Sequence, residues 1–426
     1  MLSTGTPVLA TQPSRTSVLS PQASGRARSL RCAGRWLRGG AFLVALALLV
    51  AGSGCRRAEA SPAVVYLFEP GQLVALDPRD GRAVWRAAVP LDHACAVSPS
   101  PDGRWVALVS ERLVLVPTGQ LEEVLVVDPP PGWSFTGCNL PYGTFASAVS
   151  VLSWPENRVL FAVLRKGLPY PDEWAVASYD AEARSWRAWT FPLPGYCLLL
   201  PSPVASYTIT CAVLPAELRE GIRPAGAAGG LLAIEPVDGT LVTQLPIPRA
   251  ELAAGNLRGD EPVGAAAADD RSVMLLLRNG VLVALDRAGR VQQALDVGRE
   301  EGLDSRVFGL ALRLVADDRV VWVVVYEEGM VDRLHLVLVD LRTSSVVRVV
   351  DLPGFVSDID FLPDGTVVLN RFVETAAEQS TGAPTRTVVR RDLRRGDERV
   401  LATLTDYGYC CWIGPLAPDA RAASGR

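Results

Sequence analysis

One short pattern recurs along most of this chain: an apolar strand, a turn and a second apolar strand. Seven copies occur between Leu73 and Val400. Their first strands are residues 73–77, 113–117, 175–180, 231–235, 282–286, 336–340 and 388–392. The copies follow one another at about 50 residues, a period typical of repeat proteins. A unit of this size cannot bury its apolar faces alone, so successive copies are expected to stack against one another.

A second series of turns lies between these copies. Its members are residues 101–103, 155–157, 201–203, 269–270, 317–318, 363–365 and 418–420, and most contain Pro, Asp or Gly. Each turn joins two more apolar runs, such as residues 159–164 and 320–325. These runs are short and rich in β-branched residues, which favours buried strands over helices. The pattern predicts four strands per repeat, with tight turns between the first two and the last two.

The predicted fold class is therefore all-β, a seven-bladed β-propeller of four-stranded blades. The predicted blades two to seven are residues 94–127, 147–193, 196–247, 263–297, 307–352 and 355–404. The remaining blade takes three strands from the start of the repeats, at residues 64–68, 73–76 and 83–89, and its innermost strand from residues 407–413. Pairing of the N- and C-terminal strands is expected to close the ring.

The first 60 residues form a separate segment. Residues 1–54 contain six arginines and no acidic residue, and residues 41–51 are an apolar run of the length found in signal peptides. We expect residues 1–60 to be an export signal or membrane anchor, residues 61–420 the propeller, and residues 421–426 a tail. Residues 52–55 resemble a lipobox at their last three positions, which makes Cys55 a lipidation candidate, although Gly52 stands where Leu or Val is preferred. Cleavage after Ala60 and retention of an uncleaved anchor are the alternatives.

Charge argues against nucleic acid as a partner. Without the six leader arginines, the chain has 36 basic residues against 46 acidic ones, and a net acidic chain repels phosphates. Nearly all the basic residues are arginine, and Lys166 is the lone lysine. Amine chemistry would have to use Lys166, which is expected to be a solvated lysine in a loop.

Six cysteines remain after Cys32 and Cys55, and an exported chain permits disulfides. Cys197 and Cys211 flank a predicted hairpin symmetrically, so we expect a bridge between them. Three further cysteines are expected on the innermost strands of adjoining blades, and a bridge between one early and one late member would lock the ring. These are Cys95, Cys410 and Cys411, with Cys138 left for the other late cysteine.

Two resemblances to known repeats support a superfamily of exported propellers. The first repeat, Ala75-Leu76-Asp77-Pro78-Arg79-Asp80-Gly81-Arg82-Ala83-Val84-Trp85, resembles the tryptophan-docking repeat of pyrroloquinoline quinone (PQQ) dehydrogenases. That resemblance implies a vicinal disulfide of Cys410 with Cys411 against the cofactor, but those enzymes have eight blades and a longer chain. The Pro-Asp-Gly turns resemble the WD40-like repeats of TolB-type periplasmic propellers. No cofactor is predicted, and PQQ is the alternative.

The sequence contains few candidates for catalysis. Its two histidines, His93 and His335, have no partner at metal-ligand spacing, so no metal site and no catalytic residue is predicted. A serine nucleophile using one of these histidines as its base stays open, although no Gly-x-Ser-x-Gly motif is present. A histidine at a strand end is otherwise expected to be hydrogen-bonded only.

The long connections are all expected on one face, because they join the second strand to the third or one blade to the next. Insertions gathered on one face of a repeat protein mark its binding face. Aromatic side chains in these connections are candidate contacts for a partner or a sugar, or they pack over the blade ends. They are Trp133, Phe135, Tyr142, Tyr170 and Phe372.

These features predict a propeller outside the cytoplasm, associated with a membrane through its N-terminal segment. The expected role is a binding or scaffold module for an envelope protein or for a small ligand such as a carbohydrate. The alternative is a propeller enzyme, either a PQQ-type dehydrogenase or a sugar or lactone hydrolase.

Overall fold

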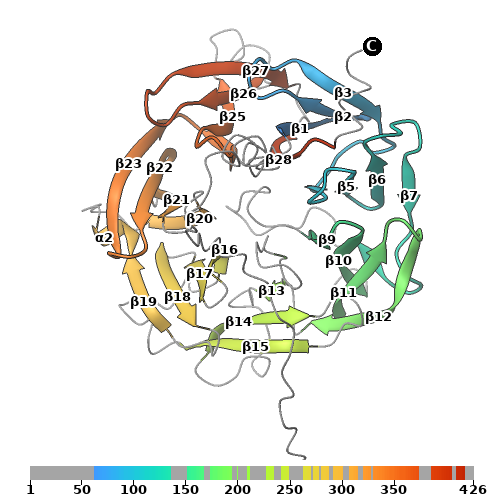
Figure 1. Ribbon diagram of the computed structural model, residues 1–426, viewed down its shortest axis with the longest axis horizontal. Helices are drawn as coiled ribbons and strands as arrows, with labels where there is room; N and C mark the ends of the chain where they lie inside the picture. The colour runs from blue at the N-terminus through green and yellow to red at the C-terminus, as the bar shows by residue number, and fades with distance from the viewer. Residues whose placement is uncertain are drawn as a thin grey trace, which may run out of the picture. The chain divides into compact units, whose positions relative to one another are not determined.

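The computed structural model describes residues 62–135, 151–166, 173–193, 199, 209–211, 227–234, 241–248, 262–269, 272–277, 280–286, 291–300, 307–314, 320–327, 330–373, 385–404 and 409–417. All of them belong to one compact unit, Ala60–Arg426. They are mostly β-strand (Figure 1), and the one helix described among them is the short α2 (Val297–Glu300). The predicted all-β class is confirmed. No helix in this part of the chain is long and apolar enough to span a membrane. The leader and Cys55 lie outside the described residues.

The described strands form seven sheets, and each sheet corresponds to one predicted blade. The first sheet has the order β28 (Tyr409–Pro415), β1 (Ala63–Glu69), β2 (Gln72–Leu76), β3 (Ala83–Ala88). The second contains β4 (Ala96–Pro99), β5 (Trp105–Val109), β6 (Leu113–Pro117) and β7 (Leu125–Val127). The third contains β8 (Ser134–Phe135), β9 (Leu152–Glu156), β10 (Val159–Lys166), β11 (Glu173–Asp180) and β12 (Ser185–Leu193).

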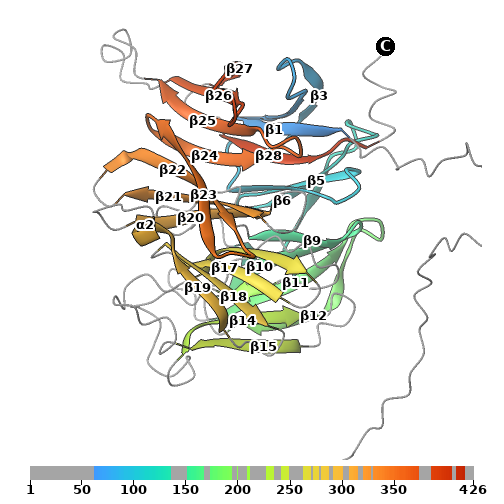
Figure 2. The same cartoon turned by 60° about the vertical axis from the view of Figure 1, so that its left-hand side comes forward.

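The other four sheets follow in chain order and can be traced in both views (Figures 1 and 2). The fourth contains β13 (Ile209–Cys211), β14 (Ala227–Ile234) and β15 (Leu241–Pro248). The fifth contains β16 (Pro262–Asp269), β17 (Ser272–Leu277), β18 (Val281–Asp286) and β19 (Val291–Asp296). The sixth contains β20 (Val307–Leu314), β21 (Val320–Glu327), β22 (Met330–Asp340) and β23 (Ser345–Pro353). The seventh contains β24 (Val356–Phe361), β25 (Val367–Val373), β26 (Thr385–Arg391) and β27 (Glu398–Leu404).

The core lies between neighbouring sheets. Inner strands such as β5 and β10 are apolar along most of their length, because both of their faces are covered. One cluster joins Tyr66 and Trp85 of the first sheet to Leu108 of the second. Another joins Val65 of the first sheet to Val368 of the seventh. Trp85, the tryptophan of the docking-like repeat, is 7% exposed and therefore packs between two sheets.

A C-terminal strand pairs with the first strand of the repeats, as the sequence predicts. Strand β28 runs antiparallel to β1, with Val65 opposite Ile413. The Tyr66 hydroxyl donates to the Pro415 carbonyl at 3.2 Å, and Leu416 N donates to Pro62 O at 2.9 Å. Burial raises the pKa of the Tyr66 phenol far above its ordinary value. These contacts hold the two ends of the described chain together.

The turns between the third and fourth strands share one construction. Each begins with an aspartate whose carboxylate accepts the backbone N–H two residues later, which explains the recurrent Asp at the end of each repeat. The acceptors are Asp77 (2.8 Å), Asp180 (3.1 Å), Asp340 (2.8 Å) and Asp392 (2.7 Å). Hydrogen bonds from Arg394 N and Arg395 N lower the pKa of Asp392 in the same way.

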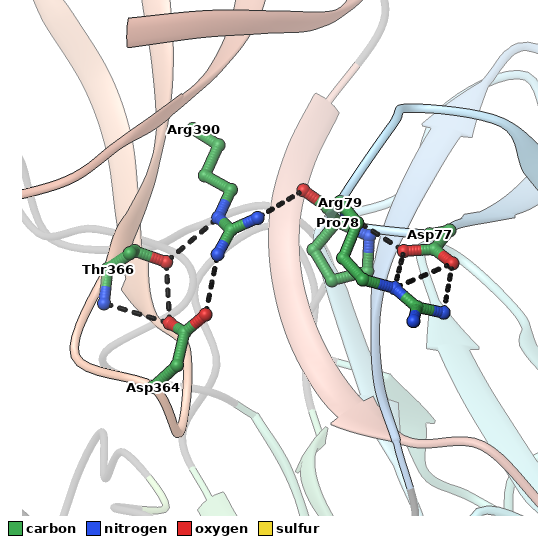
Figure 3. Close-up of polar contacts among 6 residues, drawn as sticks. All are labelled: Asp77, Pro78, Arg79, Asp364, Thr366 and Arg390. Atoms are coloured by element: carbon green, nitrogen blue, oxygen red, sulfur yellow. Dashed lines mark hydrogen bonds and ion pairs between the residues drawn. The ribbon is translucent and has the colours of Figure 1, made fainter. Parts of the chain in front are cut away.

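We call the end of each sheet that carries these turns, and the turns between its first and second strands, the turn end. The opposite end, where second strands lead to third strands, is the loop end. At the turn end, Arg390 of β26 connects the seventh sheet to the first (Figure 3). Its guanidinium donates to Asp364 at 2.6 Å, to Thr366 Oγ1 at 3.0 Å and to Pro78 O at 3.3 Å. Burial acts to raise the pKa of Asp364, but hydrogen bonds from Thr366 and the charge of Arg390 hold it below its ordinary value.

Candidate functional site

An aromatic group with a cation lies at the loop end of the seventh sheet. Phe372 near the end of β25 is directly opposite Arg386 near the start of β26, and the guanidinium carbon lies 4.6 Å from the centre of the Phe372 ring. Phe355, just before β24, packs edge-on against Phe372 with ring centres 4.9 Å apart. Phe355 is 44% exposed. We call Phe355, Phe372 and Arg386 the aromatic group. It offers an apolar face beside a positive charge, a combination suited to sugars, aromatic side chains and carboxylates.

A second cation lies over an aromatic ring at the loop end of the third sheet. The Lys166 ammonium at the end of β10 is 5.9 Å from the ring centre of the half-buried Trp133. It also forms an ion pair with Glu173 at 3.2 Å, and the lysine side chain is half exposed. The lone lysine therefore lies in solvent with a carboxylate partner, as expected for a surface lysine. An ion pair in such an exposed position contributes little to stability.

Phe135, expected on the binding face, is instead a core residue. It lies on the short strand β8, opposite Leu164 of β10, and is 2% exposed. Its ring centre is 6.2 Å from that of Trp186. Two backbone pairings draw this part of the long connection into the sheet, so its aromatic side chain fills the core, the packing alternative named above. The other two aromatic candidates, Tyr142 and Tyr170, lie outside the described residues.

Both histidines are hydrogen-bonded at the loop end of a sheet. His93 precedes β4, and its Nε2 lies 2.7 Å from Oγ of Ser110, which follows β5. Ser110 is 2% exposed. His335 on β22 is directly opposite Asp351 on β23, and its Nδ1 lies 2.8 Å from the carboxylate. The described residues contain no cluster of three or more His, Cys, Asp or Glu that could hold a metal ion.

Sequence reasoning missed a buried polar group in the seventh sheet. Asp358 and Asp360 alternate with apolar residues on β24 and are 4% and 8% exposed. Each carboxylate accepts the next backbone N–H, at 2.9 Å and 2.8 Å, and Asp360 also accepts from Ile413 N of β28 at 3.2 Å. Asn370, opposite Asp358, is 1% exposed, and its Oδ1 has no hydrogen-bond partner. Asp360 thus links the seventh sheet to the first.

The expected bridge between an early and a late inner strand is not formed. Cys410 and Cys411 are joined to one another on β28, with Cα atoms 3.2 Å apart, and both are buried. Cys95 is also disulfide-bonded, and its partner is therefore neither of these two. The expectation was wrong because each late thiol has a nearer partner in its chain neighbour than on another strand. Cys138, Cys197 and the side chain of Cys211 lie outside the described residues.

Comparison with known proteins supports the fold. A periplasmic gluconolactonase of Pseudomonas aeruginosa, PpgL, is 16% identical, with a TM-score of 0.51 over 83% of this chain and 99% of that one. Dihydro-heme d1 dehydrogenase NirN gives 0.49 at 16% identity over 85% and 78% of the two chains. A protein of unknown function from Desulfotomaculum acetoxidans gives 0.48 at 11% identity over 83% and 99%. No family model matches the chain, and no curated protein matches it.

Proposed function

We propose that the chain is a seven-bladed β-propeller, exported and attached to a membrane through residues 1–60, that binds a partner at its loop end. The pairing of β28 with β1 supports closure of the ring, because it completes the first blade from both ends of the chain. Export is consistent with the periplasmic location of the similar P. aeruginosa gluconolactonase. The ligand is an envelope protein or a small ligand such as a carbohydrate.

The aromatic group carries this proposal. Phe355 is one of the few large apolar side chains in the described residues with more than 40% exposure, and it lies beside the stacked Phe372 and Arg386. Aromatic and arginine side chains dominate the energetics of protein interfaces, and truncation of such an anchor costs about 2 kcal/mol or more. An exposed ring supported by a second ring is already ordered, so binding loses little side-chain entropy.

The test replaces Phe355 and Arg386 by serine and glutamine, one at a time, and measures partner capture after cross-linking in native membranes. We expect Phe355→Ser to reduce recovery of a specific partner at least tenfold while the melting temperature stays within about 1 °C, since this residue is exposed. Val347→Ser, an equally exposed apolar position on the outer strand β23, is the matched control and should capture normally. Equal capture by the Phe355 and Val347 variants would contradict the assignment of the aromatic group.

A hydrolase is the second candidate, and the contact between Ser110 and His93 is the observation that favours it. A histidine nitrogen at this distance from a serine hydroxyl can remove its proton as the oxygen attacks an ester or lactone carbonyl. The test is hydrolysis of a panel of sugar lactones by the purified chain and by Ser110→Ala. Turnover that disappears in the variant would establish the enzyme, whereas equal rates with both proteins would exclude Ser110 as nucleophile. A PQQ-type dehydrogenase is tested separately, by dye reduction with added PQQ.

A further inference from the structure

The described chain begins at the turn end of the first sheet. Val65 pairs with Leu76, the last residue of β2, so the residues before Val65 lie beside the turn that follows Leu76. On the other side, Pro62 O accepts a hydrogen bond from Leu416 N. The segment that precedes Pro62 therefore leaves the propeller from its turn end and not from its loop end.

A turn of the second sheet also lies beside this exit. Gly103 has φ = +72°, and a side chain placed there would meet Pro415 O and approach Ala417 N to 2.9 Å. The turn around Gly103 is therefore packed against the chain that leaves β28. The first-sheet turn of residues 77–82 and this second-sheet turn flank Pro62 on two sides.

Both turns have their aspartates directed inward and their arginines directed outward. Each carboxylate accepts a backbone N–H of its own turn, at 2.8 Å for Asp77, 3.0 Å for Asp80 and 3.1 Å for Asp102. These three acidic side chains are 24%, 35% and 25% exposed. Their arginine partners are 78%, 86% and 62% exposed, and they are Arg79, Arg82 and Arg104. The outermost charges around the exit are thus positive, although the chain as a whole is acidic.

The length of the preceding segment limits how far this end can lie from an anchor. Six residues separate Cys55 from Pro62, and an extended chain spans at most about 3.5 Å per residue, or roughly 25 Å for these seven steps. A strand of seven residues is about as long as this tether. The loop end, a full strand length beyond the exit, could therefore reach the bilayer surface only if the whole tether ran back alongside the propeller.

We propose that the turn end of the first two sheets faces the bilayer and that Arg79, Arg82 and Arg104 contact anionic phospholipid headgroups. This inference rests on the proposed membrane attachment and adds an orientation to it. Guanidinium groups pair with phosphate through two parallel hydrogen bonds, and each arginine near an anionic leaflet strengthens binding by roughly fivefold. The loop end, with the aromatic group, then points away from the membrane, where a soluble or envelope partner can reach it.

The test places a photo-cross-linking residue at one end or the other of the full-length chain in vesicles. We would compare Arg82→p-benzoylphenylalanine with Arg112→p-benzoylphenylalanine, since Arg112 is an exposed arginine in the β5–β6 connection at the loop end. Irradiation followed by mass spectrometry counts lipid adducts. We expect at least fivefold more adducts at position 82. Equal yields, or more at position 112, would overturn the orientation. A chain that does not sediment with vesicles before irradiation would instead overturn the membrane attachment on which the inference rests.

Headgroup contact has its own readout. In vesicles containing phosphatidylglycerol and phosphatidylcholine, adducts formed by Arg104→p-benzoylphenylalanine should be enriched in phosphatidylglycerol several-fold over the bulk composition. Adding Arg79→Glu and Arg82→Glu should remove this enrichment, whereas adding Arg112→Glu should preserve it. Adducts at bulk composition in the otherwise unchanged chain would contradict the headgroup contact.

Discussion

Replacement of Gly81 by alanine tests the contact between the seventh and first sheets. Gly81 has φ = +75° in the turn after β2, and an added Cβ would meet the backbone of Leu401 on β27, with the carbonyl oxygen nearest and Cα at 2.9 Å. A left-handed conformation costs a residue other than glycine about 1–2 kcal/mol. Overpacking against backbone, which cannot rotate away, adds about 1–3 kcal/mol. We expect Gly81→Ala to lower the free energy of unfolding by roughly 2–5 kcal/mol.

Gly396 provides a matched control, because it occupies the same position in the turn after β26. Its φ is +79°, its N–H donates to Asp392 O at 2.8 Å as Gly81 N donates to Asp77 O at 2.8 Å, and no atom lies within 4 Å of an added Cβ. Gly396→Ala should therefore show the conformational cost alone, about 1–2 kcal/mol.

The assay is denaturant unfolding followed by tryptophan fluorescence, with calorimetry in parallel. Since unfolding entropy is about 2 cal/mol/K per residue, 1 kcal/mol corresponds to about 1.3 °C in a unit of this size. The two variants should therefore differ by roughly 1–4 °C. Equal destabilisation by Gly81→Ala and Gly396→Ala would refute the packing of the first-sheet turn on β27, and with it the main support for ring closure at the turn end.

Three further predictions concern the same junctions. Gly103→Ala should destabilise the protein more than Gly365→Ala by calorimetry, because an added Cβ meets Pro415 O at Gly103 and nothing within 4 Å at Gly365. Hydrogen bonds from Arg371, opposed by burial, hold the pKa of Glu398 below its ordinary 4.5; the folded state thus binds fewer protons, stability falls as pH drops below this value, and Glu398→Gln should flatten the loss of urea resistance between about pH 5 and pH 3. Tyr66→Phe should cost about 1 kcal/mol in urea unfolding, and an unchanged midpoint would show that its bond at the β1–β28 pair contributes nothing.

The strand pattern could be predicted from the sequence because it depends on local chemistry. Apolar runs between Pro-Asp-Gly or Asp-x-x-x-Gly turns mark strands wherever they occur, and the pairing of β28 with β1 followed from a strand missing at one end and present at the other. The innermost strand was expected at residues 407–413 and lies at Tyr409–Pro415. This shift is small, since neighbouring apolar residues fit either register.

The candidate site was harder to predict, because it depends on which side chains meet across strands. Phe372 was expected at the loop end, but its pairing with Arg386 and Phe355 depends on register and on side-chain direction. Phe135 was misplaced because a two-residue strand such as β8 has no periodicity to detect. The polar residues of β24 were visible as an alternation, yet nothing in the sequence shows that both faces of that strand are covered.

The pairing of β1 with β28 has a consequence for synthesis. Strand β1 ends at Glu69 and β28 begins at Tyr409, so the partner of one of the first strands is among the last residues to be made. At about 5–20 residues per second, the ribosome needs roughly 20–70 s to bridge that interval. During this time one edge of β1 has no native partner, and unpaired edges attract other chains. Cells that make this protein must therefore keep the nascent chain unfolded, or shield that edge, until its final strand arrives.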